Sequence, residues 1–416
     1  MKIKIAIIIL TIIGLVACRH QNEHKTVICI PVYGQSLALG IETELITDFD
    51  SLTKYANGRV VTERMDHQFG YYDLNEIKQH VKRILHYNRK PHELTVYSMA
   101  KWLSYRTGED TVFCIFPGGQ DGTIISNLGK GTKPYNKFLD DIKTAYKSAK
   151  GRGWDFKIPA ICWMQGETDV NSYPGTNYKE LILKFVKDIN TDIKNITGQD
   201  INVKIICYQT NSLTRAEHFN PLAYNSPETE VAQTQMELIR DSSMFHASGP
   251  TYPYDCVNEI IHIDGKGQMM HGILAALPAH DILTHHKNKR GLLPLTVKSN
   301  NVEVIIDLSV PKPPLIIDTI RVAKADNYGF SVITPDNRNI IREVYLQNNS
   351  VHLLCTEPPH NCKVRYAVNG DYMKSGRLHG PRGNLRDSQG DSLTINIQGE
   401  IIPIHNWCYQ FDIQIN

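Results

Sequence analysis

Four short apolar runs in the first half of the chain limit its possible folds more than any other feature. Each run contains a cysteine, does not alternate with polar residues, and is rich in β-branched or aromatic side chains. This composition is typical of strands that are covered on both faces, as in a parallel α/β sheet. The runs are Val27–Ile30, Thr111–Phe116, Ala160–Trp163 and Lys204–Tyr208.

Residues capable of chemistry follow three of these runs directly. Gly34-Gln35-Ser36 comes after the first run, the glycine-rich segment Gly118–Gly122 after the second, and Met164–Asp169 after the third. Open α/β sheets bind their ligands at the carboxyl ends of the strands. We therefore expect a hydroxyl, a glycine loop and a carboxamide to meet at one edge of the sheet.

Segments with helical periodicity separate the runs, because apolar residues recur in them at spacings of three and four. Strands and helices alternate as βαβ units require, so we predict a three-layer α/β/α fold with a parallel sheet over residues 24–290. Ser226 is expected to be the N-cap and Pro227 a first-turn residue of a further helix. The apolar stripes run from Ile77 to Leu85, Val96 to Leu103, Phe138 to Ala149, Leu181 to Ile193 and Val231 to Ile239.

The alternation of strands and helices ends near residue 290. Apolar residues alternate with polar ones over Val302–Leu308, and the β-like runs Val344–Gln347 and Val351–Leu354 flank a turn at Asn348–Ser350. We predict a smaller β-rich, sandwich-like domain over residues 291–416. A polar, glycine-broken loop within it is interpreted as solvated; it carries Arg377, His379, Arg382, Asn384 and Arg386.

The first 18 residues have the layout of an export signal. Lys2 and Lys4 precede an apolar stretch, Ile5–Val16, which is shorter than the ~20 residues of a membrane-spanning helix. The ending Leu15-Val16-Ala17-Cys18 resembles a bacterial lipobox, whose cysteine is lipidated. The resemblance implies an exported, membrane-anchored lipoprotein of the bacterial cell envelope, periplasmic or on the surface, with Cys18 as its lipid anchor. An ordinary signal peptide cleaved nearby is the alternative.

Charge and cysteine content narrow the choice of partners. With 45 basic and 43 acidic residues the net charge is +2, which argues against nucleic acid held by electrostatics. Export permits disulfides, and Cys355 and Cys362 are the best local candidates by spacing. The cysteines of the four apolar runs are instead expected to be small apolar core residues.

Ser36 is the candidate nucleophile, and a serine needs a base that removes its proton. The best candidate base is His262, which lies between the last α/β-like segment and a helix expected near Gln268. Glu259 precedes it by three residues and orients the imidazole if the intervening chain forms a turn. Capping of the following helix by Ser36 is the alternative role.

Attack on an ester creates an oxyanion, which requires preorganised hydrogen-bond donors. The candidates are the backbone amide of Ser36, the amide of Gly122 or Gly119, and the side-chain NH2 of Gln165. Gln35, Gly119 and Glu167 are predicted to contact substrate or to support the site.

The blocks Gly34–Gly40 and Trp163–Asp169 and the segment around His262 resemble the conserved blocks of SGNH hydrolases, in the branch of sialate O-acetylesterase-like carbohydrate esterases. The resemblance covers residues 27–283 and implies an SGNH-type, flavodoxin-like fold. It assigns the oxyanion glycine to Gly122 and the remaining oxyanion donor to Gln165.

Two positions depart from the family pattern. Leu37 stands where the family has asparagine, and Glu259 stands where it has the aspartate of the triad. The acid is therefore Glu259, Asp255 from upstream, or absent, in which case the enzyme works with a Ser-His dyad.

Glu167 and Asp169 also admit a second interpretation, as a carboxylate pair for glycoside hydrolysis or for a metal. At a spacing of two in a loop, they more simply bond backbone amides and shape the turn around Gln165. Gly118-Gly119 is not followed by a phosphate-loop pattern. We expect no metal and no cofactor.

Taken together, the sequence predicts an exported, lipid-anchored carbohydrate O-acetylesterase. Its partner would be an acetylated oligo- or polysaccharide, and its membrane contact would be through the lipid anchor alone. A lipase or thioesterase on the same scaffold is one alternative; an α/β-hydrolase is disfavoured because Ser36 lacks the Gly-x-Ser-x-Gly elbow. A glycan-binding surface lipoprotein with an inactive SGNH fold is the other alternative.

Overall fold

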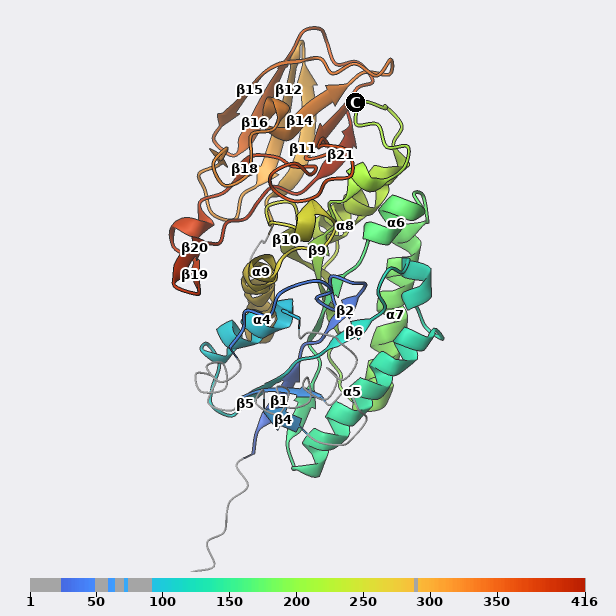
Figure 1. The fold of residues 1–416 in the computed structure, drawn as a ribbon, viewed down its shortest axis with the longest axis vertical. Coiled ribbons are helices and arrows are strands. Elements are labelled where there is room, and N and C mark those ends of the chain that lie inside the picture. The colour runs from blue at the N-terminus through green and yellow to red at the C-terminus, as the bar shows by residue number, and fades with distance from the viewer. Residues whose placement is uncertain (1–23, 49–58, 64–70, 74–91, 288–290, 416) are drawn as a thin grey trace, which may run out of the picture.

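The computed structural model describes residues 24–48, 59–63, 71–73, 92–287 and 291–415. An α/β part and a β-rich C-terminal part lie at opposite ends of the long axis of the molecule (Figure 1). The predicted fold class is thereby confirmed. The expected helix around Ile77–Leu85 and the export signal with Cys18 lie outside the described residues.

The four apolar runs all form strands of a largely parallel sheet, in which prolines interrupt several lines of pairing. Proline lacks an N–H for the ladder. Hydrogen bonds continue across the interruptions, from Val32 N to Phe116 O (3.0 Å) and from Cys162 N to Pro31 O (2.9 Å). The pairing orders are β4-β3-β5-β1-β7 and β10-β9-β8-β2-β6. Among these ten described strands, only the β3–β4 pair is antiparallel. The strands are β1 (Thr26–Cys29), β2 (Val32–Gly34), β3 (Val60–Glu63), β4 (Tyr71–Asp73), β5 (Thr111–Cys114), β6 (Pro117–Gly119), β7 (Asp155–Lys157), β8 (Ala160–Met164), β9 (Lys204–Gln209) and β10 (Phe245–Pro250).

Helices cover both faces of this sheet (Figure 1). On one face lie α4 (Thr95–Ser104) and α9 (Gly265–Thr284); on the other lie α5 (Lys133–Gly151), α7 (Tyr178–Thr197) and α8 (Glu230–Asp241). The predicted stripes on α4, α5, α7 and α8 face the sheet, so these helices and the three-layer arrangement are confirmed. Within the described ranges, no helix is both long and apolar enough to cross a membrane.

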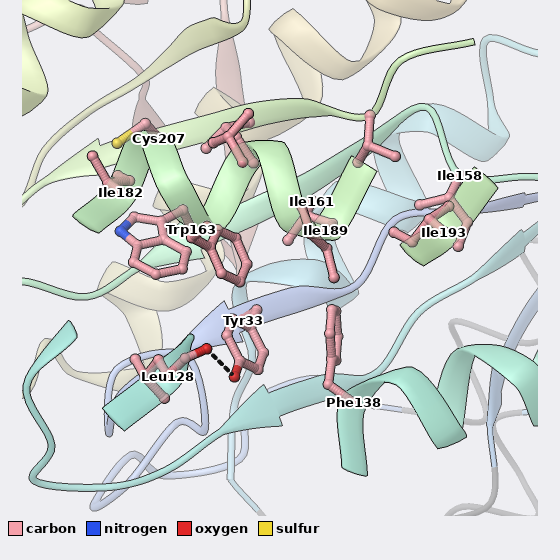
Figure 2. Packing of buried hydrophobic residues seen from close by; sticks show 14 of the residues in the cluster. Tyr33, Leu128, Phe138, Ile158, Ile161, Trp163, Ile182, Ile189, Ile193 and Cys207 are labelled. Carbon is pink, nitrogen blue, oxygen red and sulfur yellow. Dashed lines mark hydrogen bonds between the residues drawn. The ribbon is translucent and has the colours of Figure 1, made fainter. Parts of the chain in front are cut away.

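An aromatic cluster fixes the end of β2, from which the Ser36 segment leaves the sheet (Figure 2). The Tyr33 ring stacks on Phe185 with centroids 5.4 Å apart, and its hydroxyl donates to Leu128 O at 2.9 Å. Trp163, at the end of β8, donates its indole N–H to the Tyr178 hydroxyl at 3.0 Å. Both strand ends are therefore held by buried rings whose polar atoms have partners.

The C-terminal part is built of antiparallel sheets that pack against each other. The predicted alternation is confirmed, because Val304, Ile306 and Leu308 are buried in the shared core. The predicted hairpin also forms, with β15 and β16 joined through the expected turn. The pairing orders are β11-β12-β16-β15, β14-β17-β21, β13-β18 and β19-β20. The strands are β11 (Leu293–Asn300), β12 (Glu303–Ser309), β13 (Ile316–Ile317), β14 (Phe330–Ile333), β15 (Ile341–Gln347), β16 (Ser350–Cys355), β17 (Lys363–Tyr366), β18 (Leu385–Arg386), β19 (Thr394–Ile397), β20 (Glu400–Pro403) and β21 (Phe411–Gln414).

The expected disulfide between Cys355 and Cys362 is wrong, because both are free, buried thiols. Cys355 ends β16 in one sheet, whereas Cys362 leads into β17 of another. Each Sγ lies instead near a backbone carbonyl of its own segment, Leu353 O for Cys355 and His360 O for Cys362. Burial raises the pKa of Cys355 to about 11, so it is a neutral thiol at ordinary pH.

The polar loop of the C-terminal part is only partly solvated: His379 is exposed, as expected from the sequence, whereas Asn384 is not. Asn384 is fully buried and donates to the carbonyls of Asp318 and Val322, both at 3.0 Å. The Arg386 Nε atom lies 2.6 Å from the Asp318 carboxylate. Asn384 thus satisfies buried backbone carbonyls, and Arg386 pairs with a buried carboxylate, which is why polar residues are needed inside this part of the protein.

Candidate active site

Ser36 follows β2 directly, at the carboxyl edge of the parallel sheet. Its segment forms a tight turn, in which Ala38 N donates to Gln35 O and Ile41 N donates to Ser36 O, both at 3.0 Å. Ser36 is only 2% exposed. No residue in the described part of the chain hydrogen-bonds its hydroxyl, so the alternative role as a helix cap is not observed.

Gln35 fastens this turn to the segment that contains Gln165. Its side-chain Oε1 accepts from Gly166 N at 3.2 Å and from Thr168 N at 3.4 Å. Its own N–H donates to Met164 O at 3.0 Å. Gln35 therefore holds the serine turn in register with the end of β8, as a supporting residue would.

The glycine loop lies against the same turn. Gly119 pairs with Gly34, and a Cβ at Gly119 would lie 1.9 Å from Gly34 O, so only glycine allows this approach. Gly122 is exposed and has a φ of +59°, in the region that favours glycine. The next carbonyl, Thr123 O, accepts from Gln165 Nε2 at 3.3 Å. The three predicted segments therefore meet at one sheet edge.

Hydrogen bonds to neighbouring residues already occupy the side-chain NH2 group of Gln165, the predicted oxyanion donor. Its NH2 group donates to Thr123 O and to the Asp169 carboxylate, and its backbone carbonyl accepts from Tyr178 and Gln235, both at 2.9 Å. Its side-chain Oε1 is buried and has no partner within the described chain. Both amide hydrogens are thus engaged, and the longer bond, to Thr123, is the one that an oxyanion would have to replace.

The two carboxylates near Gln165 have structural partners. Asp169 accepts from Ile125 N at 3.0 Å and from Thr176 Oγ1 at 2.8 Å, in addition to Gln165. Glu167 accepts from the Tyr208 hydroxyl at 2.6 Å. Burial raises the pKa of Glu167, against the lowering effect of the Tyr208 bond. The simpler interpretation of this pair, in which the carboxylates shape the turn, matches these contacts.

His262 lies on a loop between β10 and α9. The loop is a short hairpin, since Val257 N donates to His262 O at 2.8 Å and Asp264 N to Asp255 O at 2.9 Å. The imidazole Nδ1 lies 2.7 Å from a carboxylate oxygen of Glu42. Because a carboxylate accepts, Nδ1 carries the hydrogen and the neutral ring keeps Nε2 as a proton acceptor. Within the described residues, Nε2 has no partner.

Glu259 does not orient His262, which corrects the prediction for the acid. Its carboxylate contacts Lys374 Nζ at 2.6 Å and His379 Nδ1, both from the C-terminal part. Asn258 and Glu259 have φ values of +54° and +57°, so the chain does not form the regular turn that the prediction required. The alternative acid, Asp255, pairs with Arg377 Nε at 2.8 Å.

Glu42, which the sequence reasoning missed, takes this position through the turn that begins at Ser36. Its segment is anchored by Glu93, a buried carboxylate that accepts from Ile46 N at 2.9 Å and from Thr47 N at 2.7 Å. Glu42 and His262 are 220 positions apart, so no local spacing joins them. The only feature of the sequence that could have indicated Glu42 is that it is a carboxylate a few residues after the candidate nucleophile.

Further contacts bring the His262 loop to the serine turn. Gln268, in the first turn of α9, donates its side-chain N–H to Leu37 O at 2.9 Å. The positive charge that His262 can carry also lowers the pKa of Glu167, which is raised above all by burial, so the ring lies within electrostatic reach of that carboxylate. Ser36, His262 and the Gln165 turn therefore share one neighbourhood, whereas their catalytic roles stay predictions.

Comparisons with known proteins bear on the family and on the fold. A family model described as "Carbohydrate esterase, sialic acid-specific acetylesterase" matches residues 96–274. The crystal structure of XAC1771, a carbohydrate acetylesterase from Xanthomonas citri, superposes with a TM-score of 0.57 at 12% identity, over 86% of this chain and 80% of that one. No curated protein matches the sequence.

Two further solved structures are similar over a smaller share of this chain. A protein from Arabidopsis thaliana has a TM-score of 0.44 at 14% identity, over 63% of this chain and 99% of that one. NanS has a TM-score of 0.43 at 13% identity, over 63% of this chain and 98% of that one. None of the comparisons supports the alternative of an inactive glycan-binding lipoprotein.

The matched segment includes the blocks around Gln165 and His262, while Ser36 lies before it. The predicted resemblance is therefore confirmed: residues 96–274 match the carbohydrate esterase family model, and the fold is shared with a carbohydrate acetylesterase.

Proposed function

We propose that this chain is a serine esterase that removes O-acetyl groups from a carbohydrate, with Ser36 as nucleophile, His262 as base and Glu42 as the orienting acid. The observation that carries the proposal is the 2.7 Å contact between His262 Nδ1 and Glu42, because it ties the imidazole to the turn that begins at Ser36 and leaves Nε2 without a partner among the described residues. The carbohydrate esterase family supports the substrate class.

In the first half of the reaction, the Ser36 oxygen attacks the acetyl carbonyl carbon while His262 Nε2 takes the serine proton. Glu42 stabilises the imidazolium that forms. The oxyanion accepts from the amide of Ser36, from the amide of Gly122 or Gly119, and from Gln165 once its bond to Thr123 opens. The sugar oxygen then leaves with the proton from His262, and the acetyl group stays on Ser36.

In the second half, water attacks the acetyl-serine. His262 accepts a proton from the water and returns it to the Ser36 oxygen, so acetate is released and the enzyme is restored. The same donors hold the second oxyanion. The chain's own residues thus supply every proton transfer in the cycle.

The test is Ser36→Ala, assayed by acetate release from acetylated oligosaccharides and from p-nitrophenyl acetate. We expect turnover to fall by about 10⁴-fold or more. Ser148→Ala is the matched control, because Ser148 is also a buried serine without a side-chain partner but lies on α5. Undiminished turnover in Ser36→Ala would reject the proposal.

Fluorophosphonate labelling separates this proposal from its alternatives. An inactive glycan-binding protein would not react at Ser36, whereas the esterase should be labelled there and lose the label in Ser36→Ala. A lipase or thioesterase would prefer long acyl esters, so the ratio of p-nitrophenyl acetate to p-nitrophenyl palmitate turnover distinguishes it from an acetylesterase.

We also propose that the chain is exported and lipid-anchored through Cys18, on the strength of the signal-like sequence alone. Metabolic labelling with a radioactive fatty acid should mark the wild-type chain, and Cys18→Ala should abolish the label and release the protein from the membrane fraction. Equal membrane association of both proteins would contradict the anchor.

A further inference from the structure

A cavity of about 390 Å³ lies between the α/β part and the C-terminal part. Tyr254 and Met270 line it from one side, and Trp407 and His405 line it from the other. Ile320, at its rim, is 91% exposed. Ligand sites commonly have this size and occur between two parts of a protein.

The cavity adjoins the loop that carries His262. Asp255 and Asp264 line it, and they form the base of the hairpin on whose second arm His262 lies. Cys256 and Ile263 pair across the same hairpin. His262 and Asp264 are two positions apart, a separation of at most about 7 Å along the chain. The cavity therefore lies against the hairpin that carries the proposed base.

The charges on the wall are balanced. Arg377 pairs with Asp255 at 2.8 Å, and Lys266 pairs with Glu400 at 2.7 Å. These ion pairs offer both hydrogen-bond donors and acceptors, while their opposite charges cancel. Such a wall suits a neutral ligand with many hydroxyl groups better than it suits an ion. The charged lining residues are Asp255, Asp264, Glu400, Lys266, Arg321 and Arg377.

His405 adds a directed donor to this wall. Its Nδ1 accepts from Gly390 N at 3.0 Å, so the hydrogen of the neutral ring sits on Nε2. Burial, together with the charge of Arg386, lowers the pKa of His405 to about 4 and keeps the ring neutral. Nε2 has no partner in the described part of the chain, and the residue lines the cavity.

We propose that this cavity is a saccharide subsite, which holds neutral sugar units next to the acetylated unit of an oligosaccharide. The rings of Tyr254 and Trp407 and the side chain of Ile320 supply apolar surface for sugar faces, while the paired charges and His405 meet the hydroxyls. The proposal rests on the proposed function, and it makes the substrate a chain of several sugars rather than a free acetylated monosaccharide.

The kinetic test compares substrates that differ only in length. Wild-type protein is assayed on monoacetylated xylose and xylotetraose, and on monoacetylated glucose and cellotetraose. We expect kcat/KM to be about tenfold or more higher on the tetrasaccharide in at least one series, because only the longer chain reaches the cavity. Equal kcat/KM on short and long substrates in both series would overturn the proposal.

The variant test uses Ile320→Ala combined with Lys266→Ala, two changes at the exposed rim. We expect KM on the preferred tetrasaccharide to rise about tenfold, with activity on p-nitrophenyl acetate unchanged. Leu183→Ala combined with Lys184→Ala is the matched control, since it removes an exposed leucine and an ion-paired lysine from α7. An unchanged KM in the rim variant would contradict the subsite.

A binding measurement separates failure of the subsite from failure of the proposed function. Ser36→Ala protein is titrated with deacetylated xylotetraose and cellotetraose, and tryptophan fluorescence is followed with Trp407→Phe as the control. A change that needs Trp407 supports the subsite even if the wild type releases no acetate. If the wild type releases acetate but neither sugar causes a fluorescence change that depends on Trp407, the subsite proposal is rejected and the esterase proposal stands.

Discussion

The α/β part and the C-terminal β-rich part contribute to the active site in different ways. The α/β part places Ser36, the glycine loop and Gln165 at the ends of neighbouring strands, where open sheets bind ligands. The C-terminal part places no predicted catalytic residue there, yet it contacts the loop that carries His262. The family match covers residues 96–274, so Ser36 and Glu42 lie before the matched segment.

The contact is made by one segment of the C-terminal part, residues 371–380. Its backbone donates from Ser375 N to Glu259 O at 2.9 Å and from Arg377 N to Tyr254 O at 3.0 Å. It also reaches the α/β part elsewhere, from Met373 N to Thr214 O at 3.1 Å. Glu259 therefore serves as an anchor for this segment, while Glu42 from the serine turn supports the imidazole.

The largest expected effect comes from exchanging the carboxylates of Glu42 and Glu259 for amides in separate proteins. Glu42→Gln should lower kcat on p-nitrophenyl acetate by about 1,000-fold, because the amide cannot stabilise the imidazolium and favours the wrong tautomer. Glu259→Gln should lower kcat by less than about tenfold, since its carboxylate does not contact the ring.

Circular dichroism of both proteins is the control for folding. The reverse order of effects would restore Glu259 as the acid and remove the distinction between the two parts. Equal, small effects would point to a Ser-His dyad.

A second prediction concerns the bond between the two parts. Arg365 on β17 is fully buried, pairs with Asp412 at 3.0 Å, and donates to Pro221 O and Tyr224 O of the α/β part. Arg365→Met should destabilise the protein by about 3–5 kcal/mol, because it leaves the Asp412 carboxylate buried without its cation.

Urea denaturation measures this change. Arg365→Met combined with Asp412→Leu should recover much of the lost stability, since no unpaired charge then remains buried. Arg338→Met, which removes an exposed ion pair with Asp336, should have little effect. A large loss in the exposed variant and none in the buried one would contradict the argument.

The sequence predicted the elements of the molecule whose signal is local. The strand that contains Cys29 was predicted because burial on both faces requires an unbroken apolar run. The apolar stripe on α7 was predicted because a buried helix face repeats every 3.6 residues. The meeting of Ser36 with Gln165 followed from one topological rule for parallel sheets.

Pairings across distant segments could not be predicted in this way. The Glu42–His262 contact joins a turn to a loop 220 positions away, and the bond of Glu259 to Lys374 crosses between the two parts. Cys355 and Cys362 are close in sequence but belong to different sheets, so their spacing misled the disulfide prediction. Each of these contacts depends on how distant elements pack together, and the sequence of a single segment does not determine that packing.

The smallest predicted effect is a pH dependence at the anchor between the parts. Glu259 has a lowered pKa because Lys374, and then His379, hydrogen-bond its carboxylate. A lowered pKa in the folded state means that the ionised group stabilises the fold. That stabilisation is complete above the ordinary glutamate pKa of 4.5 and is lost as the pH falls through the lowered value.

Glu259→Gln should therefore lower the melting temperature by about 1–2 °C near pH 7, a small change because the pair is partly exposed. The difference from wild type should shrink below pH 4.5 and disappear where Glu259 is protonated in both states. Glu109→Gln, at an exposed carboxylate of the turn before β5, controls for general charge effects. A difference that grows on acidification would mean that the carboxylate weakens the contact between the parts, and the anchoring role of Glu259 would have to be given up.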